Sequence, residues 1–294
     1  MSDLSPLGEP SKDEHPDALT ALDSLAKSFA DKGDAERALP LYEECLAKRR
    51  RILGFDHPDT LDSLNNLAGS LHCFTDKNRA LPLYEECLAR RKRVLGEDHP
   101  DTLTSLDHLA NFYRCKADWD RALPLYEECL AIQKRVFGDD HPDTLMSLDA
   151  VAQTLCSKGE YDRALPLHEE CLAKRKAVFG SDHPATFDSI DNLGKVFLGS
   201  GQYNRAWPLF EQCLTWRRQN LGEDHPLTIE SLSILAGLFN KMADYDRALP
   251  LFEECLEKQK VCFGADSSDA KSTQMMRDEC ARKLKQKSGK CLFM

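Results

Sequence analysis

The feature that most constrains the fold is a twelve-residue segment that returns six times at one fixed spacing. The segment DRALPLYEECLA begins at Asp120. Near-copies, each 42 residues from the next, begin at Glu36, Asn78, Asp162, Asn204 and Asp246. A second segment, of the form HPDTL, keeps the same spacing and begins at His15, His57, His99, His141, His183 and His225. Self-similarity at such a period predicts a solenoid of stacked units, and six units fill residues 15–266.

Each unit has room for two helices. From Leu103 to Tyr113 the apolar residues recur at helical spacing, and Pro100 stands at a first helical position, where a missing N–H is tolerated. The turn KADWD follows, and a second helix is expected from Arg121 to Gly138. No strand pattern is found. The sequence predicts an all-α fold, a right-handed α-solenoid of six 42-residue helix–turn–helix units with a C-terminal capping helix.

The same period sets the expected domain boundaries. A flexible tail is expected over residues 1–14, the six-unit solenoid over 15–266, a capping helix over 267–287 and a flexible tail over 288–294. Terminal units of a solenoid need such a cap, because their outer face has no neighbour.

Six of the twelve cysteines occupy one position of the repeat: Cys45, Cys87, Cys129, Cys171, Cys213 and Cys255. Equivalent positions of packed helices lie roughly 10 Å apart, whereas the Cα atoms of a disulfide approach within about 7 Å. We therefore expect reduced thiols that serve as small packing residues. Neither a C-x-x-C pair for zinc nor a phosphate-binding GxxxxGK[ST] motif is found, so no metal site, cofactor or catalytic activity is expected.

Charge and hydropathy narrow the class of protein. The net charge is −10, which disfavours nucleic-acid binding, since that needs Lys and Arg against phosphates. No stretch is long and apolar enough to span a bilayer, and the first residues lack the features of a signal peptide. A cytoplasmic location is expected. Two basic runs, at 48–51 and 90–93, resemble nuclear localisation signals, but solvated helix ends explain them better.

The residue pattern within a unit resembles the tetratricopeptide repeat. It shows Leu64, Leu67, Ala68 and Leu71 in the first helix, then Ala80, Tyr84 and Cys87 in the second. HEAT and armadillo repeats have similar periods, but this pattern of large and small residues favours the tetratricopeptide signature. The 42-residue unit with its LxxxLGxDHPDT link is similar to the kinesin light chain type. About 14 residues precede the first unit, too few for the coiled coil of kinesin light chains.

The resemblance implies a peptide-binding face formed by the first helices. Carried onto this sequence, the inward positions predict a groove of twelve residues: Asp23, Asp62, Asn65, Asp107, Asn111, Arg114, Asp149, Gln153, Asp188, Asp191, Lys195 and Glu230. Acidic residues outnumber basic ones among the inward positions. We therefore expect a protein or peptide ligand with basic residues.

The last residues suggest a lipid anchor. Cys291 begins the sequence CLFM, which has the order of a C-a-a-X prenylation box, and basic residues precede it at Arg282, Lys283, Lys285, Lys287 and Lys290. Four interpretations of the function follow. The first is a protein–protein interaction scaffold, and the second is the same scaffold tethered to a membrane through Cys291. The third is a kinesin light chain-like cargo adaptor, and the fourth is a relative of the sensor arrays of signalling ATPases.

Overall fold

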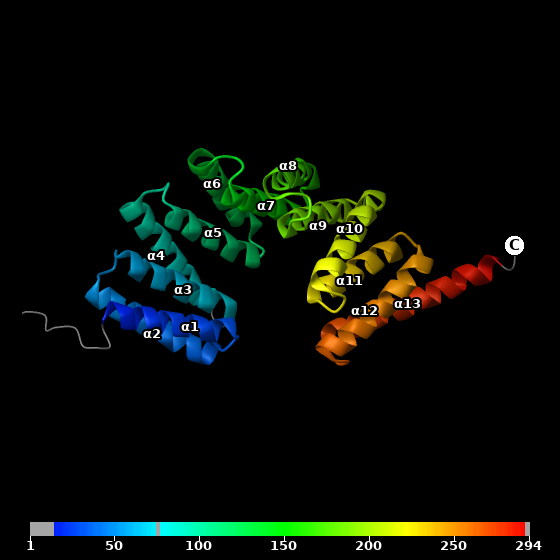
Figure 1. Ribbon diagram of the computed structural model, residues 1–294, viewed down its shortest axis with the longest axis horizontal. Helices are drawn as coiled ribbons and strands as arrows, with labels where there is room; N and C mark the ends of the chain where they lie inside the picture. The colour runs from blue at the N-terminus through cyan, green and yellow to red at the C-terminus, as the bar shows by residue number, and fades with distance from the viewer. Residues whose placement is uncertain (1–14, 75–76, 292–294) are drawn as a thin grey trace, which may run out of the picture. The chain divides into compact units, whose positions relative to one another are not determined.

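The computed structural model describes residues 15–74 and 77–291, with side chains as far as Lys287 (Figure 1). These residues form thirteen helices and no strand, as the repeat pattern predicts. The helices are α1 (Pro16–Asp31), α2 (Ala35–Ile52), α3 (Pro58–Phe74), α4 (Lys77–Leu95), α5 (Pro100–Cys115), α6 (Trp119–Phe137), α7 (Pro142–Ser157), α8 (Tyr161–Phe179), α9 (Pro184–Gly199), α10 (Tyr203–Leu221), α11 (Pro226–Lys241), α12 (Tyr245–Phe263) and α13 (Ser268–Cys291).

The chain divides into two compact bodies, one up to Ser147 and one from Leu148 onward. Within the first body, α1 packs on α2, α3 on α4 and α5 on α6, while α2 also packs on α3 and α4 on α5. The second body repeats the arrangement from α8 to α12. This stacking of like units is that of an α-solenoid, the predicted fold class.

The histidine of each HPD-type link caps the first helix of its unit. Nδ1 of His99 accepts the backbone N–H of Asp101 at 3.2 Å, and Pro100 follows at the first helical position. The same contact recurs at His15, His57, His141, His183 and His225. These caps satisfy one of the free N–H groups at each helix start, so the repeated histidines have a structural role.

The turn between the two helices of a unit requires a left-handed backbone. Glycine supplies it at Gly33, Gly159 and Gly201, but Ala117 and Ala243 take the same conformation with φ of 56° and 57°. The second helix begins sooner after this turn than the sequence indicated: α6 starts at Trp119, two residues before Arg121. The proline of ALPL is therefore the sixth residue of the helix, where it removes one backbone hydrogen bond.

The cysteine column is fully buried, and these thiols are free, so the packing prediction is confirmed. Sγ of Cys87 lies 3.4 Å from the carbonyl oxygen of Leu61 and 3.4 Å from Oγ of Ser105. Cys87 thus joins its own unit to the next. Burial raises the pKa of Cys129 to about 11 and that of Cys213 to about 12, which keeps both thiols protonated and unreactive at neutral pH.

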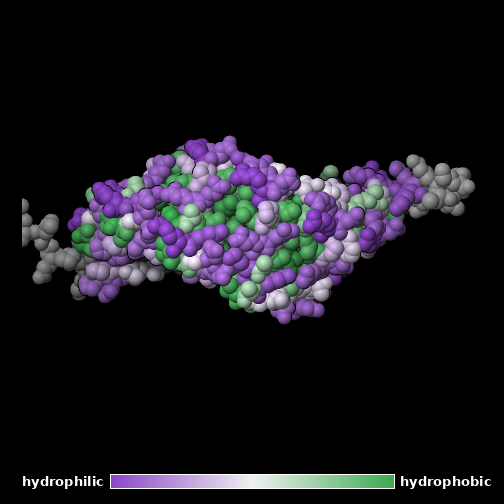
Figure 2. All heavy atoms as spheres, turned by 90° about the horizontal axis from the view of Figure 1, so that it is seen from above, coloured by the Kyte–Doolittle hydropathy of each residue, from purple (hydrophilic) through white to green (hydrophobic). Residues whose placement is uncertain are grey.

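The last helix, α13, packs on α12 and contacts α11. Cys280 is fully buried there, and Met276 packs against the same core. The helix begins one residue after the expected 267 and continues to Cys291, beyond the expected boundary at 287. Figure 2 shows hydrophilic side chains over most of the face in view, with hydrophobic ones visible between them.

Candidate functional site

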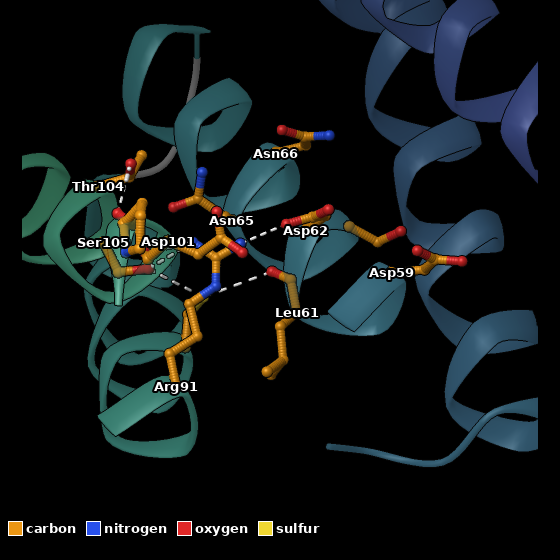
Figure 3. A network of polar contacts seen from close by, with 12 residues as sticks. Asp59, Leu61, Asp62, Asn65, Asn66, Arg91, Asp101, Thr104 and Ser105 are labelled. Carbon is orange, nitrogen blue, oxygen red and sulfur yellow. Dashed lines mark hydrogen bonds and ion pairs between the residues drawn. The ribbon is translucent and has the colours of Figure 1, made fainter. Parts of the chain in front are cut away.

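A buried arginine stands behind the first-helix face in four of the six units. Arg91 of α4 is 3% exposed. Its Nη1 donates to the carbonyl oxygen of Asp101 and to Oγ of Ser105, both at 2.8 Å. Its Nη2 forms an ion pair with the carboxylate of Asp62 on α3, and Figure 3 shows the guanidinium between these groups. One side chain thereby ties three helices together.

The arrangement recurs at 42-residue intervals. Nη1 of the equivalent arginine donates to Oγ of a serine in the next first helix at 2.6–2.9 Å; the pairs are Arg49–Ser63, Arg175–Ser189 and Arg217–Ser231. Arg49 and Arg91 belong to the two basic runs interpreted as solvated helix ends. For these two residues that interpretation is wrong. Both guanidinium groups are buried because the facing helix offers a carbonyl and a hydroxyl that replace water.

These arginines neutralise part of the predicted acidic face. Asp149 on α7 is 7% exposed, and Nη2 of Arg175 lies 3.5 Å from it. Nδ1 of His168 is 3.3 Å from the same carboxylate, and Nδ2 of Asn192 donates to both of its oxygens at 3.1 Å. Nε2 of Gln153 adds a further hydrogen bond at 3.1 Å. Asp149 is thus the centre of a satisfied polar network.

The pKa values of Asp149 and Asp62 reflect how many donors surround each carboxylate. Burial by itself would raise the pKa of Asp149, but its contacts with His168, Arg175 and Asn192 outweigh burial and hold that pKa below the ordinary value. Asp62 is more exposed, and burial raises its pKa because desolvation outweighs the attraction of Arg91. A carboxylate on this face is therefore stabilised only where several donors converge on it.

Other predicted groove residues also find partners within the chain. Asp191 pairs with Lys195 at 2.7 Å and with Arg217 at 3.5 Å. Asp23 accepts a hydrogen bond from Nδ2 of Asn66, one unit later, at 3.1 Å. The structure therefore brings the predicted acids onto first helices but matches many of them with internal donors.

The remaining predicted residues are either paired locally or open to solvent. Oδ1 of Asn65 is 2.9 Å from Nδ1 of His108. Nη2 of Arg114 donates to Oδ1 of Asn111 at 2.6 Å. Asp188 and Glu230 are exposed. The expected lipidation site Cys291 and its C-a-a-X box lie outside the residues whose side chains the structure describes.

Asp107 on α5 differs from its counterparts. In the described part of the chain no ion pair reaches its carboxylate, and Arg114, the cation whose charge acts on it, is held by Asn111. Burial raises the pKa of Asp107, and the charge of Arg114 only partly opposes this. The residue in the arginine position of this unit is Gln133, which is 7% exposed. Asp107 is thus a half-buried carboxylate without its arginine.

Asp107 and Gln133 line a hollow of about 280 Å³ in the first body. Leu103, Phe137 and Met146 form its apolar side. Oε1 of Gln133 is buried and accepts no hydrogen bond from the described residues. The hollow therefore presents acceptors at its base and an apolar wall beside them.

Neither a metal cluster nor a membrane helix is found in the described residues. No group of three or more His, Cys, Asp or Glu side chains is placed to hold a metal ion. Among the helices of residues 15–74 and 77–291, none combines the length and the apolar character needed to cross a bilayer.

The buried arginines are the functional-site residues that the sequence pattern did not predict. They follow each repeat cysteine by four positions, so their 42-residue spacing is visible in the sequence. The exchange to glutamine at Gln133 and Gln259 is visible as well. The spacing of the arginines and the exchange to glutamine are both hard to notice among the neighbouring Lys and Arg residues, because a basic helix end is ordinarily solvated.

The fold and the repeat define the class of protein. The tetratricopeptide repeat model matches residues 17–93, 76–130, 101–177, 149–215 and 200–260. These segments cover most of the chain, and the chain belongs to the tetratricopeptide repeat family. No curated protein is similar enough in sequence to count as a relative.

Solved structures place the chain near the kinesin light chain type. A Podosopora anserina protein described as a kinesin light chain with nearly identical TPR-like repeats is 28% identical, with a TM-score of 0.63 over 70% of this chain and 98% of that one. BtubC (BKLC) from P. vanneervenii is 18% identical, with a TM-score of 0.66 over 80% and 94% of the two chains.

A third solved structure comes from a larger protein. It is a signal transduction ATPase with numerous domains from Pyrococcus horikoshii that carries a tetratricopeptide repeat sensor. The identity is 15% and the TM-score 0.63, over 87% of this chain and 38% of that one. Together the three structures confirm the tetratricopeptide solenoid fold, and the likeness to the kinesin light chain type comes from the repeats of the Podosopora anserina protein.

Proposed function

We propose that this chain is a protein–protein interaction scaffold that holds an extended segment of a partner protein against the first helices of its units. The observation that carries the proposal is a difference between two columns of the repeat. The buried cysteine column is the same in all six units. An exposed first-helix column changes from unit to unit: Thr20, Asp62, Thr104, Met146, Asp188 and Glu230. Constant buried positions hold the stack together, and varied exposed positions give a surface its selectivity.

Two further observations support the same face. Met146 is a large apolar side chain with 65% of its surface exposed, which is costly in water and useful against a partner. The hollow at Asp107 opens beside it. A peptide on such a face is held by a few anchoring side chains, and the other contacts contribute less.

Photo-crosslinking from chosen positions tests this function. A benzophenone amino acid replaces Met146 or Glu230 on the first helices, and in matched controls it replaces Val94 or Val178, exposed residues of second helices. We expect one set of protein partners to be captured from the first-helix positions and not from the controls. Capture from the second-helix positions alone would contradict the proposed face.

A further inference from the structure

The third unit contains a site that four other units fill with their own arginine. In those units the arginine reaches the facing serine, the facing carbonyl and, at Asp62, Asp149 and Asp191, the carboxylate of a first helix. In the third unit the shorter Gln133 stands there, while Asp107 is retained. The acceptors remain, but the cation that would join them is missing.

A second exchange removes another donor from Asp107. Asp23 and Asp149 each accept a hydrogen bond from an asparagine 43 residues later, Asn66 and Asn192. The residue 43 positions after Asp107 is Ala150, whose methyl group cannot donate. The same carboxylate thus lacks both its arginine and its amide. Burying a charge without partners is unfavourable, so a cation that reaches this carboxylate stabilises it.

We propose that the hollow formed by Asp107 and Gln133 is a receptor for an arginine side chain of the partner protein. This inference rests on the proposed function, since it names the side chain that anchors the bound segment. Arg91 shows how such a group is held: its guanidinium contacts a carboxylate, a hydroxyl and a carbonyl together. At the hollow the partner's guanidinium enters from the first-helix face and takes the place that an internal arginine occupies elsewhere.

The chemistry of the hollow suits arginine in particular. The carboxylate of Asp107 and the free Oε1 of Gln133 are acceptors, and a guanidinium offers five donors in a planar fork. Leu103, Phe137 and Met146 provide an apolar wall for the methylene stem of the same side chain. Asp143, which also lines the hollow, adds a second negative charge. An arginine side chain can therefore use the polar base and the apolar wall together.

A second hollow, within the second body, shows the contrasting case. About 310 Å³ in volume, it is lined by Gln153, His168, Asn192 and Lys195. Three of these residues already contact the carboxylate of Asp149. No acceptor of comparable charge is left for a ligand among the described residues that line it, so this hollow is not an arginine receptor.

The test is a titration of the full-length chain by nuclear magnetic resonance. The probe is the peptide acetyl-Gly-Ala-Arg-Ala-Gly-amide, and the control peptide carries citrulline, which has the shape of arginine without its charge. We expect the arginine peptide to shift the backbone amides around Asp107 and Gln133, and the citrulline peptide to bind about tenfold more weakly. Added salt should weaken the binding of the arginine peptide.

Variants distinguish binding of the arginine peptide at this site from its non-specific attraction to a negatively charged protein. Asp107→Asn should weaken the arginine peptide about tenfold, and Gln133→Arg should abolish binding because the internal arginine fills the hollow. Gln259→Arg is the matched control: it makes the same exchange in the sixth unit, where Ser233 replaces the aspartate, and should leave binding unchanged. Equal binding of the two peptides, unchanged binding in Gln133→Arg, or no shift around Asp107 overturns the inference.

Two more results would overturn the receptor or the scaffold separately. If replacing Lys283, Lys285 and Lys287 by Gln shifts the amides around Asp107 in the absence of peptide, the hollow belongs to the chain's own basic segment and the partner assignment is wrong. If partner crosslinks from Glu230 persist while Asp107→Asn and Gln133→Arg have no effect, the scaffold function stands and the arginine receptor fails. Absence of crosslinks from both first-helix positions removes the scaffold function itself.

Discussion

The third and fourth units carry the same aspartate at the same position and treat it in opposite ways. Asp149 lies among Arg175, His168 and Asn192, which lower its pKa. Asp107 faces Gln133, and burial raises its pKa. Three exchanges separate the two cases: His168, Arg175 and Asn192, which contact Asp149, are replaced 42 residues earlier by Tyr126, Gln133 and Ala150. A repeat protein can thus keep its fold while the aspartate of one unit loses its internal partners and becomes open to a ligand.

The largest expected difference in stability between the two units appears when the charge of Asp149 or of Asp107 is removed. Asp149→Asn leaves Arg175 buried without its counter-charge and should lower the free energy of unfolding by about 3 kcal/mol. Asp107→Asn removes a charge that has no partner and should leave the stability unchanged or raise it by up to about 1 kcal/mol. Urea denaturation at neutral pH measures both. Equal losses in the two variants would contradict the contrast between the units.

Exchanging the arginine and glutamine positions sharpens the comparison. Arg175→Gln gives the fourth unit the glutamine of the third and should cost about 2–3 kcal/mol, because Asp149 and Ser189 lose a buried donor. Gln133→Arg should stabilise the third unit by about 1 kcal/mol, since the new guanidinium finds acceptors that are already in place. Thermal unfolding of both variants checks the signs. A destabilised Gln133→Arg protein would mean that the hollow cannot accept a guanidinium.

The smallest expected effect lies in the turns of the same two units. Ala117 has a φ of 56° and Gly159 a φ of 80°, both in the left-handed region. Ala117→Gly should therefore raise the free energy of unfolding by about 1 kcal/mol, and Gly159→Ala should lower it by a similar amount. Denaturant titrations resolve changes of this size. Effects of the same sign in both variants would show that the turn is not limited by its backbone conformation.

Much of the fold follows from the sequence, because the repeat makes each signal appear six times. The period, the two helices per unit and the buried cysteine column could all be predicted. The start of the second helix could not, because Trp119 and Asp120 precede the apolar pattern that marks the helix. Ala117 in a left-handed turn was also hidden, since alanine gives no sign of a positive φ.

The candidate site was harder to predict than the fold. The first-helix position of Asp107, Asp149 and Asp191 follows from the resemblance, but their partners do not. Arg175 lies 26 residues from Asp149 in the sequence, and only the stacking of helices shows that the two meet. A count of acidic residues does not distinguish the three aspartates. In the structure Asp149 and Asp191 are paired with arginines, whereas Asp107 is not.

The pH dependence of stability follows from the same contrast. The lowered pKa of Asp149 contributes stability that is present above its ordinary value, 3.8, and is lost as the pH falls through the folded value. The raised pKa of Asp107 has the opposite sign: its charged form costs stability above the folded value, and this cost disappears as the pH falls below 3.8. Acid unfolding of this chain should therefore depend on Asp149 and not on Asp107.

The measurement that tests the central claim most directly is a titration of the two side-chain carboxyl carbons by nuclear magnetic resonance in the full-length protein. We predict that Asp107 titrates above 3.8 and Asp149 below it. In Gln133→Arg, the pKa of Asp107 should fall toward that of Asp149, because the new guanidinium favours the charged form. Equal pKa values for the two carboxyl groups, or an Asp107 that does not respond to Gln133→Arg, would contradict the account.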